Sequence, residues 1–87
     1  MKTPKEIQQE LSARERSLRK KQKMTLQQPA DASGVSLGSV KRFESSGEIS
    51  LQSMIKIAIA LGCEDDFSAI FAKNLPMSIE EIINGEI

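Results

Sequence analysis

The chain has 87 residues, enough for one small domain, and its 12 Lys and Arg balance its 12 Asp and Glu at a formal net charge of zero. It contains no His, no Trp and no Tyr, and Cys63 is its one cysteine, which excludes an intrachain disulfide and argues against metal binding and histidine-based catalysis. No apolar run approaches the roughly 20 residues of a membrane span, and the polar N-terminus lacks the apolar core of a signal peptide, so a cytoplasmic location is expected.

The zero net charge hides an asymmetry along the chain. Residues 1–42 contain ten Lys or Arg and four Asp or Glu, a net charge of +6, whereas residues 43–87 contain two and eight, a net charge of −6. Halves of opposite charge are typical of nucleic-acid binding or of an acidic tail, although ordinary solvated helices would give the same balance. Charge alone therefore does not decide between these interpretations.

The first predicted element is a helix that ends near residue 22. The sequence "TPKE" at residues 3–6 has the pattern of a capping box, with the proline at the first helical position. A second such pattern, "SARE" at residues 12–15, leaves open whether the segment is one helix or two, and we favour one continuous helix. Three apolar residues keep helical spacing across both patterns: Ile7, Leu11 and Leu18.

Two short helices joined by a glycine turn are predicted next. Thr25 suits the N-cap of the first helix, which Gly34 would end in the left-handed conformation. Ser36 suits the N-cap of the second helix, which Gly47 would end. Three apolar residues are expected in the interior of this unit: Val35, Val40 and Phe43.

A fourth and a fifth helix are predicted before a short tail. Ser50 caps the fourth helix and Gly62 stops it. Its expected buried stripe consists of Leu51, Met54, Ile55, Ala58 and Leu61. The fifth helix covers about residues 65–73, with Phe67, Ile70 and Phe71 facing inward. Pro76 then breaks the chain, and "SIEE" at residues 78–81 begins a last turn of helix. We therefore expect an all-α fold, with one domain over residues 1–75 and a tail over residues 76–87.

Several motifs in residues 11–71 carry a family resemblance. They are "LRK" at 18–20, "MT" at 24–25, "GVSLGSVKRFE" at 34–44, "GEISL" at 47–51 and "IAIALG" at 57–62. With these motifs the chain resembles the Cro/cI-type (XRE-type) helix-turn-helix family of bacterial and phage regulators. The resemblance implies a compact five-helix domain like that of lambda repressor, homodimers, no cofactor, and binding of double-stranded operator DNA in the major groove.

By this resemblance, the helix after Ser36 is the recognition helix. The residues expected at base edges are Leu37, Gly38, Ser39, Lys41 and Arg42. A guanidinium can read guanine through two hydrogen bonds, and an apolar side chain can touch a thymine methyl group. The residues expected at DNA phosphates are Arg14, Lys23, Thr25, Gln27 and Ser36. For the basic residues among them, plain solvent exposure remains the alternative.

Glu44 follows Phe43 in an otherwise apolar corner and needs a partner if it is buried. The family commonly pairs this acid with an arginine of the first helix, and the matching position here is Arg19. We interpret this pair as structural and not catalytic.

Two residues depart from the family pattern at the predicted second helix. Leu26 stands where the family usually has a Gln that binds a phosphate, and Pro29 stands where it usually has a Leu. Behind a Thr25 cap, Pro29 would remove the first helical hydrogen bond, at a cost of up to about 3 kcal/mol. Either the chain carries altered residues here, or it is a natural variant whose helix begins late, with Pro29 at its first position.

The sequence predicts a DNA-binding transcriptional regulator and leaves three roles open. The chain could act as a stand-alone repressor or as an antitoxin that also binds a toxin protein, such as a HipA-type kinase. The alternative is a protein-interaction module that has lost or weakened DNA binding. An enzyme is not expected, because the sequence shows no phosphate loop and no pairing of a nucleophile with a base. A dimer or partner surface is hypothesised at Ile59, Cys63 and Phe67, with the tail residues Ile79, Ile82 and Ile83 as the alternative cover.

Overall fold

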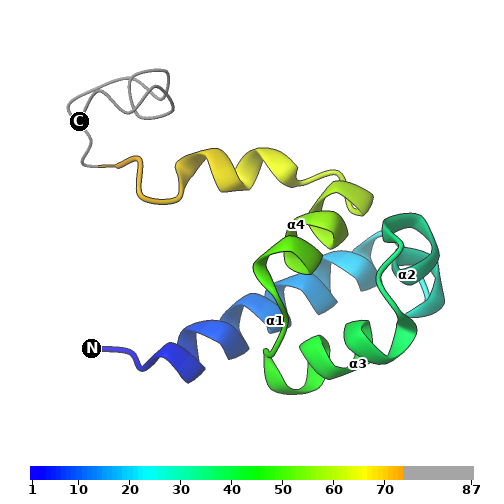
Figure 1. The fold of residues 1–87 in the computed structure, drawn as a ribbon, viewed down its shortest axis with the longest axis horizontal. Coiled ribbons are helices and arrows are strands. Elements are labelled where there is room, and N and C mark those ends of the chain that lie inside the picture. Colours follow the sequence, from blue (N-terminus) through cyan, green and yellow to red (C-terminus); the bar gives the residue numbers. More distant parts are fainter. Residues whose placement is uncertain (74–87) are drawn as a thin grey trace.

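The computed structural model describes residues 1–73, which form four α-helices and one 3-10 helix (Figure 1). The helices are α1 (Pro4–Lys21), α2 (Gln27–Ser33), α3 (Leu37–Ser46), α4 (Leu51–Ala60) and the 3-10 helix η1 (Glu64–Ala69). α1 packs against α3, α2 packs against both α3 and α4, and η1 packs against α4. None of these helices has the length and apolar character needed to cross a membrane. The predicted last turn of helix, with Ile79, Ile82 and Ile83, lies outside the described residues.

α1 is one continuous helix, as favoured from the sequence. The predicted capping box is present, because the Thr3 hydroxyl accepts a hydrogen bond from the Glu6 N–H and the Glu6 carboxylate accepts one from the Thr3 N–H, each at 3.1 Å. The second capping pattern does not interrupt the helix. There the Ser12 hydroxyl donates to the Gln9 carbonyl at 2.9 Å, inside the helix.

The turn between α2 and α3 has the predicted geometry. Gly34 adopts the left-handed conformation at φ +77° and donates its N–H to the Ala30 carbonyl at 3.0 Å, which ends α2. The buried side chain of Val35 fills the corner. The Ser36 hydroxyl then accepts the Ser39 N–H at 3.1 Å and starts α3. These three residues fix the angle at which α3 leaves α2.

The start of α2 differs from the prediction. The helix begins at Gln27, and it has no side-chain cap; the Thr25 N–H instead donates to the side-chain oxygen of Gln28 at 2.7 Å. A helix beginning at Leu26 would need an N–H on Pro29 to bond the Thr25 carbonyl, and proline has none. Pro29 is therefore the third residue of α2, where an N–H has no helical partner to lose.

Pro29 is also one of the most deeply buried side chains of the described residues. The predicted cost of a proline inside a helix is thus largely avoided, since the helix starts one residue later and the ring joins the core. The structure matches neither sequence expectation completely, because Pro29 occupies neither an interior position nor the first one.

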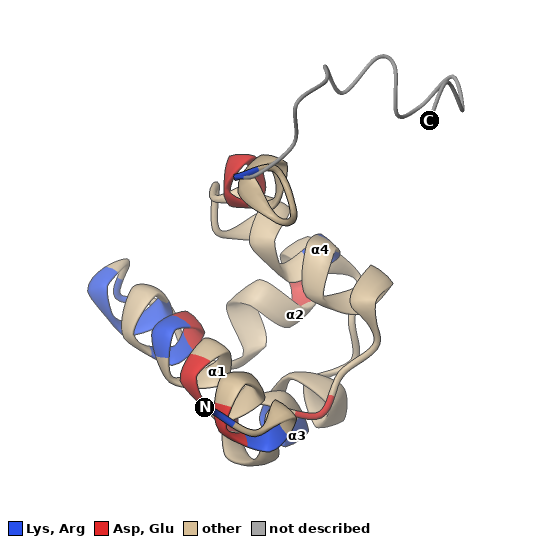
Figure 2. Ribbon diagram, turned by 90° about the vertical axis from the view of Figure 1, so that its left-hand side faces the viewer, with Lys and Arg blue, Asp and Glu red and all other residues tan. Residues whose placement is uncertain are grey.

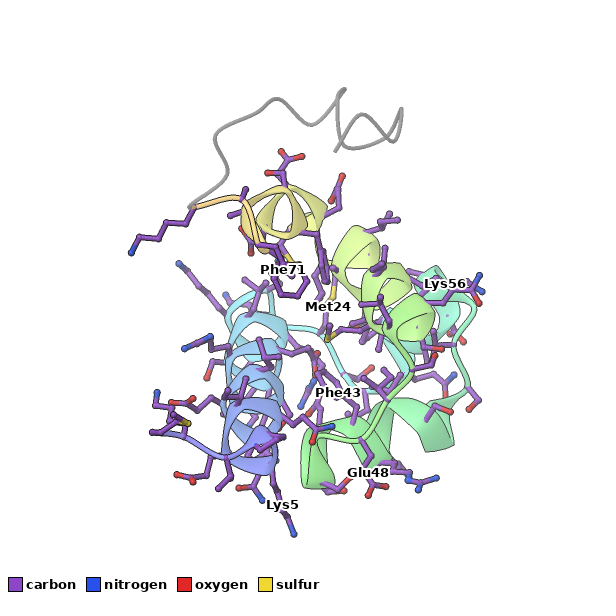
Figure 3. All side chains as sticks on the ribbon, turned by 60° about the vertical axis from the view of Figure 1, so that its left-hand side comes forward. Lys5, Met24, Phe43, Glu48, Lys56 and Phe71 are labelled. Carbon is purple, nitrogen blue, oxygen red and sulfur yellow. The ribbon has the colours of Figure 1, made fainter. Side chains whose placement is uncertain are left out.

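The core lies between α2, α3 and α4, with Leu18 of α1 packed against it, and Phe43 lies near its centre (Figure 3). Its buried residues are Ala30, Val35, Val40, Phe43, Ile57 and Leu61. The predicted stripe on α4 is partly wrong: Leu51 is 62% exposed, whereas the unpredicted Ile57 is 1% exposed. Met54, Ile57 and Leu61 also keep helical spacing, so the apolar α4 sequence allows two stripes and its packing against α2 selects one.

The predicted fifth helix is present but differs in type and burial. η1 is a 3-10 helix that ends at Ala69 and not near residue 73. Phe67 is half-buried, Ile70 is 49% exposed and Phe71 is 91% exposed, so only Phe67 faces inward as expected. Phe71 has a left-handed backbone, at φ +62°, which turns the chain after the helix.

Gly47 ends α3 where the chain passes close to α1. Its backbone is left-handed at φ +82°, and its carbonyl accepts a hydrogen bond from the Gln8 side chain at 3.4 Å. A Cβ atom on Gly47 would lie 2.9 Å from the backbone carbon of Gln8. Gly34 has a similar φ, but a Cβ atom there would meet nothing within 4 Å.

These two glycines allow backbone strain to be separated from crowding. Gly34→Ala should destabilise the fold by about 1–2 kcal/mol, the cost of a left-handed alanine. Gly47→Ala should cost about 1–3 kcal/mol more, because the new methyl group must push α1 away. Urea unfolding of both variants checks this. Equal losses in the free energy of unfolding would show that α1 moves away from the new methyl group at no cost.

Candidate nucleic-acid interface

The outer face of α3 presents most of the residues predicted at base edges. Gly38, Ser39, Lys41 and Arg42 are exposed, while Leu37 is half-buried and packs against the core. The Ser39 hydroxyl accepts a hydrogen bond from the Ser36 hydroxyl at 2.9 Å, so it takes part in the cap of the helix. The side chains that can extend freely from this face are therefore the two basic ones.

Arg42 is held in the free protein by an acid that the sequence did not point to. Its Nε and Nη2 atoms donate to one carboxylate oxygen of Glu48, at 3.0 and 2.6 Å. Both side chains are largely exposed, at 70% for Arg42 and 59% for Glu48. An exposed pair of this kind contributes only about 0–1 kcal/mol, so releasing Arg42 costs little.

The start of α2 is less open to a phosphate than predicted. Thr25 and Gln27 are exposed, but the Gln27 amide donates to the carboxylate of Asp31 at 2.7 Å. That bond uses one of the two N–H donors of the amide that would replace the Gln usual at Leu26. Leu26 itself is half-buried and packs against the core.

Arg19 and Glu44 form the ion pair expected from the resemblance. Arg19 Nε lies 2.8 Å from Glu44 Oε2, and Arg19 Nη2 lies 2.9 Å from Glu44 Oε1. Both residues are buried, and Arg19 Nη1 also donates to the Met24 carbonyl at 2.8 Å. Arg16 adds a bond from its Nη2 to the Glu44 carbonyl at 2.6 Å. The pair thus ties α1 to α3 and to the loop before α2.

The neighbours of Glu44 keep it ionised. Burial alone would raise the pKa of its carboxyl group, but the hydrogen bond from Arg19, with those of Glu15 and the nearby positive charges, holds the pKa below its ordinary value of 4.5. The same contact with Glu44 raises the pKa of the Arg19 guanidinium. A carboxylate with a lowered pKa contributes stability above its ordinary pKa, and this contribution disappears as pH falls through the folded value.

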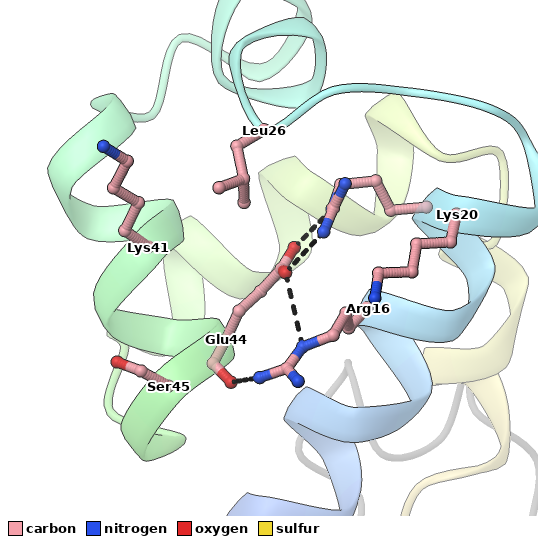
Figure 4. A pocket seen from close by; sticks show the side chains of 7 residues that line it. Arg16, Lys20, Leu26, Lys41, Glu44 and Ser45 are labelled. Carbon is pink, nitrogen blue, oxygen red and sulfur yellow. Dashed lines mark hydrogen bonds and ion pairs between the residues drawn. The ribbon is translucent and has the colours of Figure 1, made fainter.

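A basic crevice lies between α1 and α3 (Figure 4). It has a volume of about 290 Å³ and is lined by Arg16, Arg19, Lys20, Leu26, Lys41, Glu44 and Ser45. We call it the α1–α3 crevice. For Arg16 and Lys20 the sequence left open whether they contact phosphates or are ordinary surface charges. Their signal was the helical register, because Arg16 and Lys20 flank Arg19, which marks the side of α1 that faces α3.

The other residues predicted at phosphates lie apart from this crevice. Arg14 is about 200° from Arg16 around the helix and lines a second cavity, between α1, α4 and η1. Lys23 is exposed and closes the end of α1 with a left-handed backbone at φ +58°. Figure 2 shows the charge pattern of the fold, with Lys and Arg along α1 and α3 and acidic residues on η1.

The second cavity, which we call the η1 groove, has a volume of about 560 Å³. Most of its lining is apolar, with Leu11, Leu18, Met54, Phe67 and Ile70 among the residues that contribute. Cys63 also lines it, and burial raises the pKa of its thiol. Arg14 stands on its α1 side, whereas Asp65 and Asp66 stand on its η1 side. No three metal-ligating side chains gather in the part of the chain that the structure describes.

Glu15 is a half-buried residue at the wall of the η1 groove, with its carboxyl group turned away from water. Both of its carboxyl oxygens are shielded from water, and no group of residues 1–73 donates a hydrogen bond to them. Burial, together with the adjacent Glu44 carboxylate, raises the pKa of Glu15 to about 8. A protonated Glu15 can direct its own hydrogen at Glu44, which suits this site better than a second negative charge.

The fold, together with the basic face formed by α3 and the α1–α3 crevice, defines a small all-helical DNA-binding domain like that of lambda repressor. A helix-turn-helix family model matches residues 16–67, which is more than half of the chain. The chain therefore belongs to the Cro/cI-type (XRE-type) helix-turn-helix family, whose members are DNA-binding transcriptional regulators. Comparisons with curated proteins and with solved structures gave no match.

The raised pKa of Glu15 predicts a pH dependence of stability. The unfolded chain releases this proton near pH 4.5 and the folded protein near pH 8, so the free energy of unfolding should fall as pH rises between these values. Glu15→Gln should remove this fall and stabilise the fold at pH 8. Glu10→Gln, an exposed change on the same helix, should leave the fall in place. Thermal unfolding from pH 5 to pH 8.5 measures it, and an unchanged pH profile for Glu15→Gln would contradict the assignment.

Proposed function

We propose that the chain is a sequence-specific repressor that places α3 in the major groove of operator DNA. The observation that carries this proposal is the outer face of α3, where Lys41 and Arg42 extend from a rigid, capped helix beside a basic crevice. A helix of this kind fits the major groove, and its exposed side chains reach the base edges.

Arg42 is the residue proposed to read a base. A guanidinium that binds guanine through two hydrogen bonds is worth about 1–3 kcal/mol of discrimination, which exceeds the 0–1 kcal/mol of its exposed pair with Glu48. At the correct base, it is therefore favourable for Arg42 to leave Glu48 and bind guanine. Leu37 and Gly38 shape the N-terminal end of the reading face. A Cβ atom on Gly38 would meet nothing within 4 Å, so the packing of the fold does not require glycine there.

Replacement of Arg42 should reduce specificity more than affinity. Two duplexes are compared, one random and one selected from a randomised pool. Arg42→Ala should lower the ratio of their Kd values by about 5- to 100-fold. Lys23→Ala should weaken binding to both duplexes by the same factor, since a phosphate contact carries no sequence information. Fluorescence anisotropy with both duplexes checks this, and equal effects of the two variants would remove Arg42 from base reading.

A homodimer is part of the proposal, with the η1 groove as its interface. A two-fold interface uses the same patch on both copies, so the patch must complement itself. This groove offers apolar side chains together with both signs of charge, Arg14 on α1 and the Asp65–Asp66 pair on η1. Cys63 and Phe67, which were singled out in the sequence, line it. Ile59 does not line it, although its side chain is 57% exposed on α4.

Two isoleucines of similar exposure test this interface. Ile70→Lys, in the η1 groove, should weaken self-association at least tenfold, because a buried lysine would lose its hydration. Ile59→Lys should leave self-association unchanged. Sedimentation velocity at several concentrations measures both, with circular dichroism to verify folding. If only Ile59→Lys weakened self-association, the interface would lie on the outer face of α4 and not in the η1 groove.

A second candidate function is that of a protein-interaction module, as in an antitoxin that binds its toxin. The observation that favours it is the η1 groove, which is open to any protein with a complementary apolar surface. Leu26 and Pro29 support it less than the sequence suggested, because both pack into the fold. A wild-type chain that stays monomeric and binds no duplex would favour this candidate over the repressor.

A further inference from the structure

The α1–α3 crevice contains more positive charge than its internal pairs use. Four cationic residues line it, Arg16, Arg19, Lys20 and Lys41, against the single carboxylate of Glu44, which gives a net charge of +3. Arg19 is committed to Glu44, and Arg16 is oriented by its bond to the Glu44 carbonyl. Among residues 1–73, the ammonium groups of Lys20 and Lys41 form no hydrogen bond and no ion pair.

The geometry of the crevice suits a small anion. Figure 4 shows Lys41 on α3 and Lys20 on α1, at opposite sides of Leu26 and Glu44. Like charges that share a crevice repel each other, and an anion between them would replace this repulsion with attraction. The volume of about 290 Å³ lies at the lower limit of ordinary ligand pockets, so a compact group such as a phosphate fits better than a larger ligand.

We propose that the α1–α3 crevice binds a backbone phosphate of DNA between Lys20 and Lys41. This inference rests on the proposed function, and it reassigns Lys41 from base reading to phosphate binding. The usual phosphate contact of α2 is weakened here, because the Leu26 side chain has no donor and one of the two N–H groups of the Gln27 amide is bound to Asp31. The crevice lies next to that position, since Leu26 forms part of its wall. The phosphate contact is therefore displaced from the start of α2 to the space between α1 and α3.

The salt dependence of DNA binding tests this assignment. Lys20→Ala and Lys41→Ala should each weaken binding to random and selected duplexes alike, by about 5- to 10-fold at low salt, and make the plot of log Kobs against log salt shallower by up to about one. The double variant should lose less than the product of the two single losses, because both lysines act on one phosphate. Lys56→Ala, which removes a charge from the exposed side of α4, should change neither the affinity nor the salt slope.

Each other outcome overturns the inference in a recognisable way. If the wild-type chain binds duplex DNA but the two lysine variants keep its salt slope, the crevice holds no phosphate while the proposed function stands. If Lys41→Ala reduces discrimination between the duplexes, Lys41 reads a base. If no duplex binds, the proposed function fails as well. Titration with inorganic phosphate, followed by NMR, tests the other source: shifts at Lys20 and Lys41 without any effect of the variants on DNA binding would assign the crevice to a free anion.

Discussion

The buried pair of Arg19 and Glu44 is the interaction on which the arrangement of α1, α2 and α3 depends. One guanidinium binds the carboxylate of α3 through two hydrogen bonds and the Met24 carbonyl through a third. Burying two charges is costly, and the cost is met only when both partners are present and well oriented. Removing one partner of such a pair typically costs 3–5 kcal/mol, a large share of the stability of a small domain. α3 is thus positioned by electrostatics as well as by apolar packing.

The same carboxylate also determines the behaviour of the groups around it. The carboxyl group of Glu15 is easier to protonate because it is buried and because the nearby Glu44 stays charged. Arg16 is drawn against α3 by the Glu44 carbonyl and so becomes part of the wall of the α1–α3 crevice. One acidic residue therefore links the fold, the response to pH and the shape of the basic face.

Much of the fold could be predicted because its helix ends are encoded locally. Ser36 and Ser50 cap helices through their own hydroxyls, and Gly34 and Gly47 end helices in a conformation that few other residues adopt. The buried stripe of α4 could not be predicted, because Leu51 and Ile57 are equally apolar and only the packing of the whole chain chooses between them. The 3-10 form of η1 and the exposure of Phe71 could not be predicted either, because they also depend on the packing of the whole chain.

The basic face was predicted in part. Its place on α3 followed from the spacing of the motif and from the family resemblance. The partners of its side chains did not. Gln27 and Asp31 are four residues apart on α2, a spacing at which helical side chains can pair, but the sequence does not show which of the possible pairs forms. Arg42 binds Glu48 beyond the end of α3, and Lys20 and Lys41 line one crevice from two helices, so both arrangements depend on tertiary structure.

The shortness of α2 has a consequence for cooperativity. The helix has seven residues and no side-chain cap, whereas an isolated helix needs about 12–15 residues to persist in water. It exists because Pro29 and Ala30 are buried where α2 packs on α4. α2 therefore depends on the core for its stability. Loss of the core would also unfold α2, and with it the first half of the helix-turn-helix.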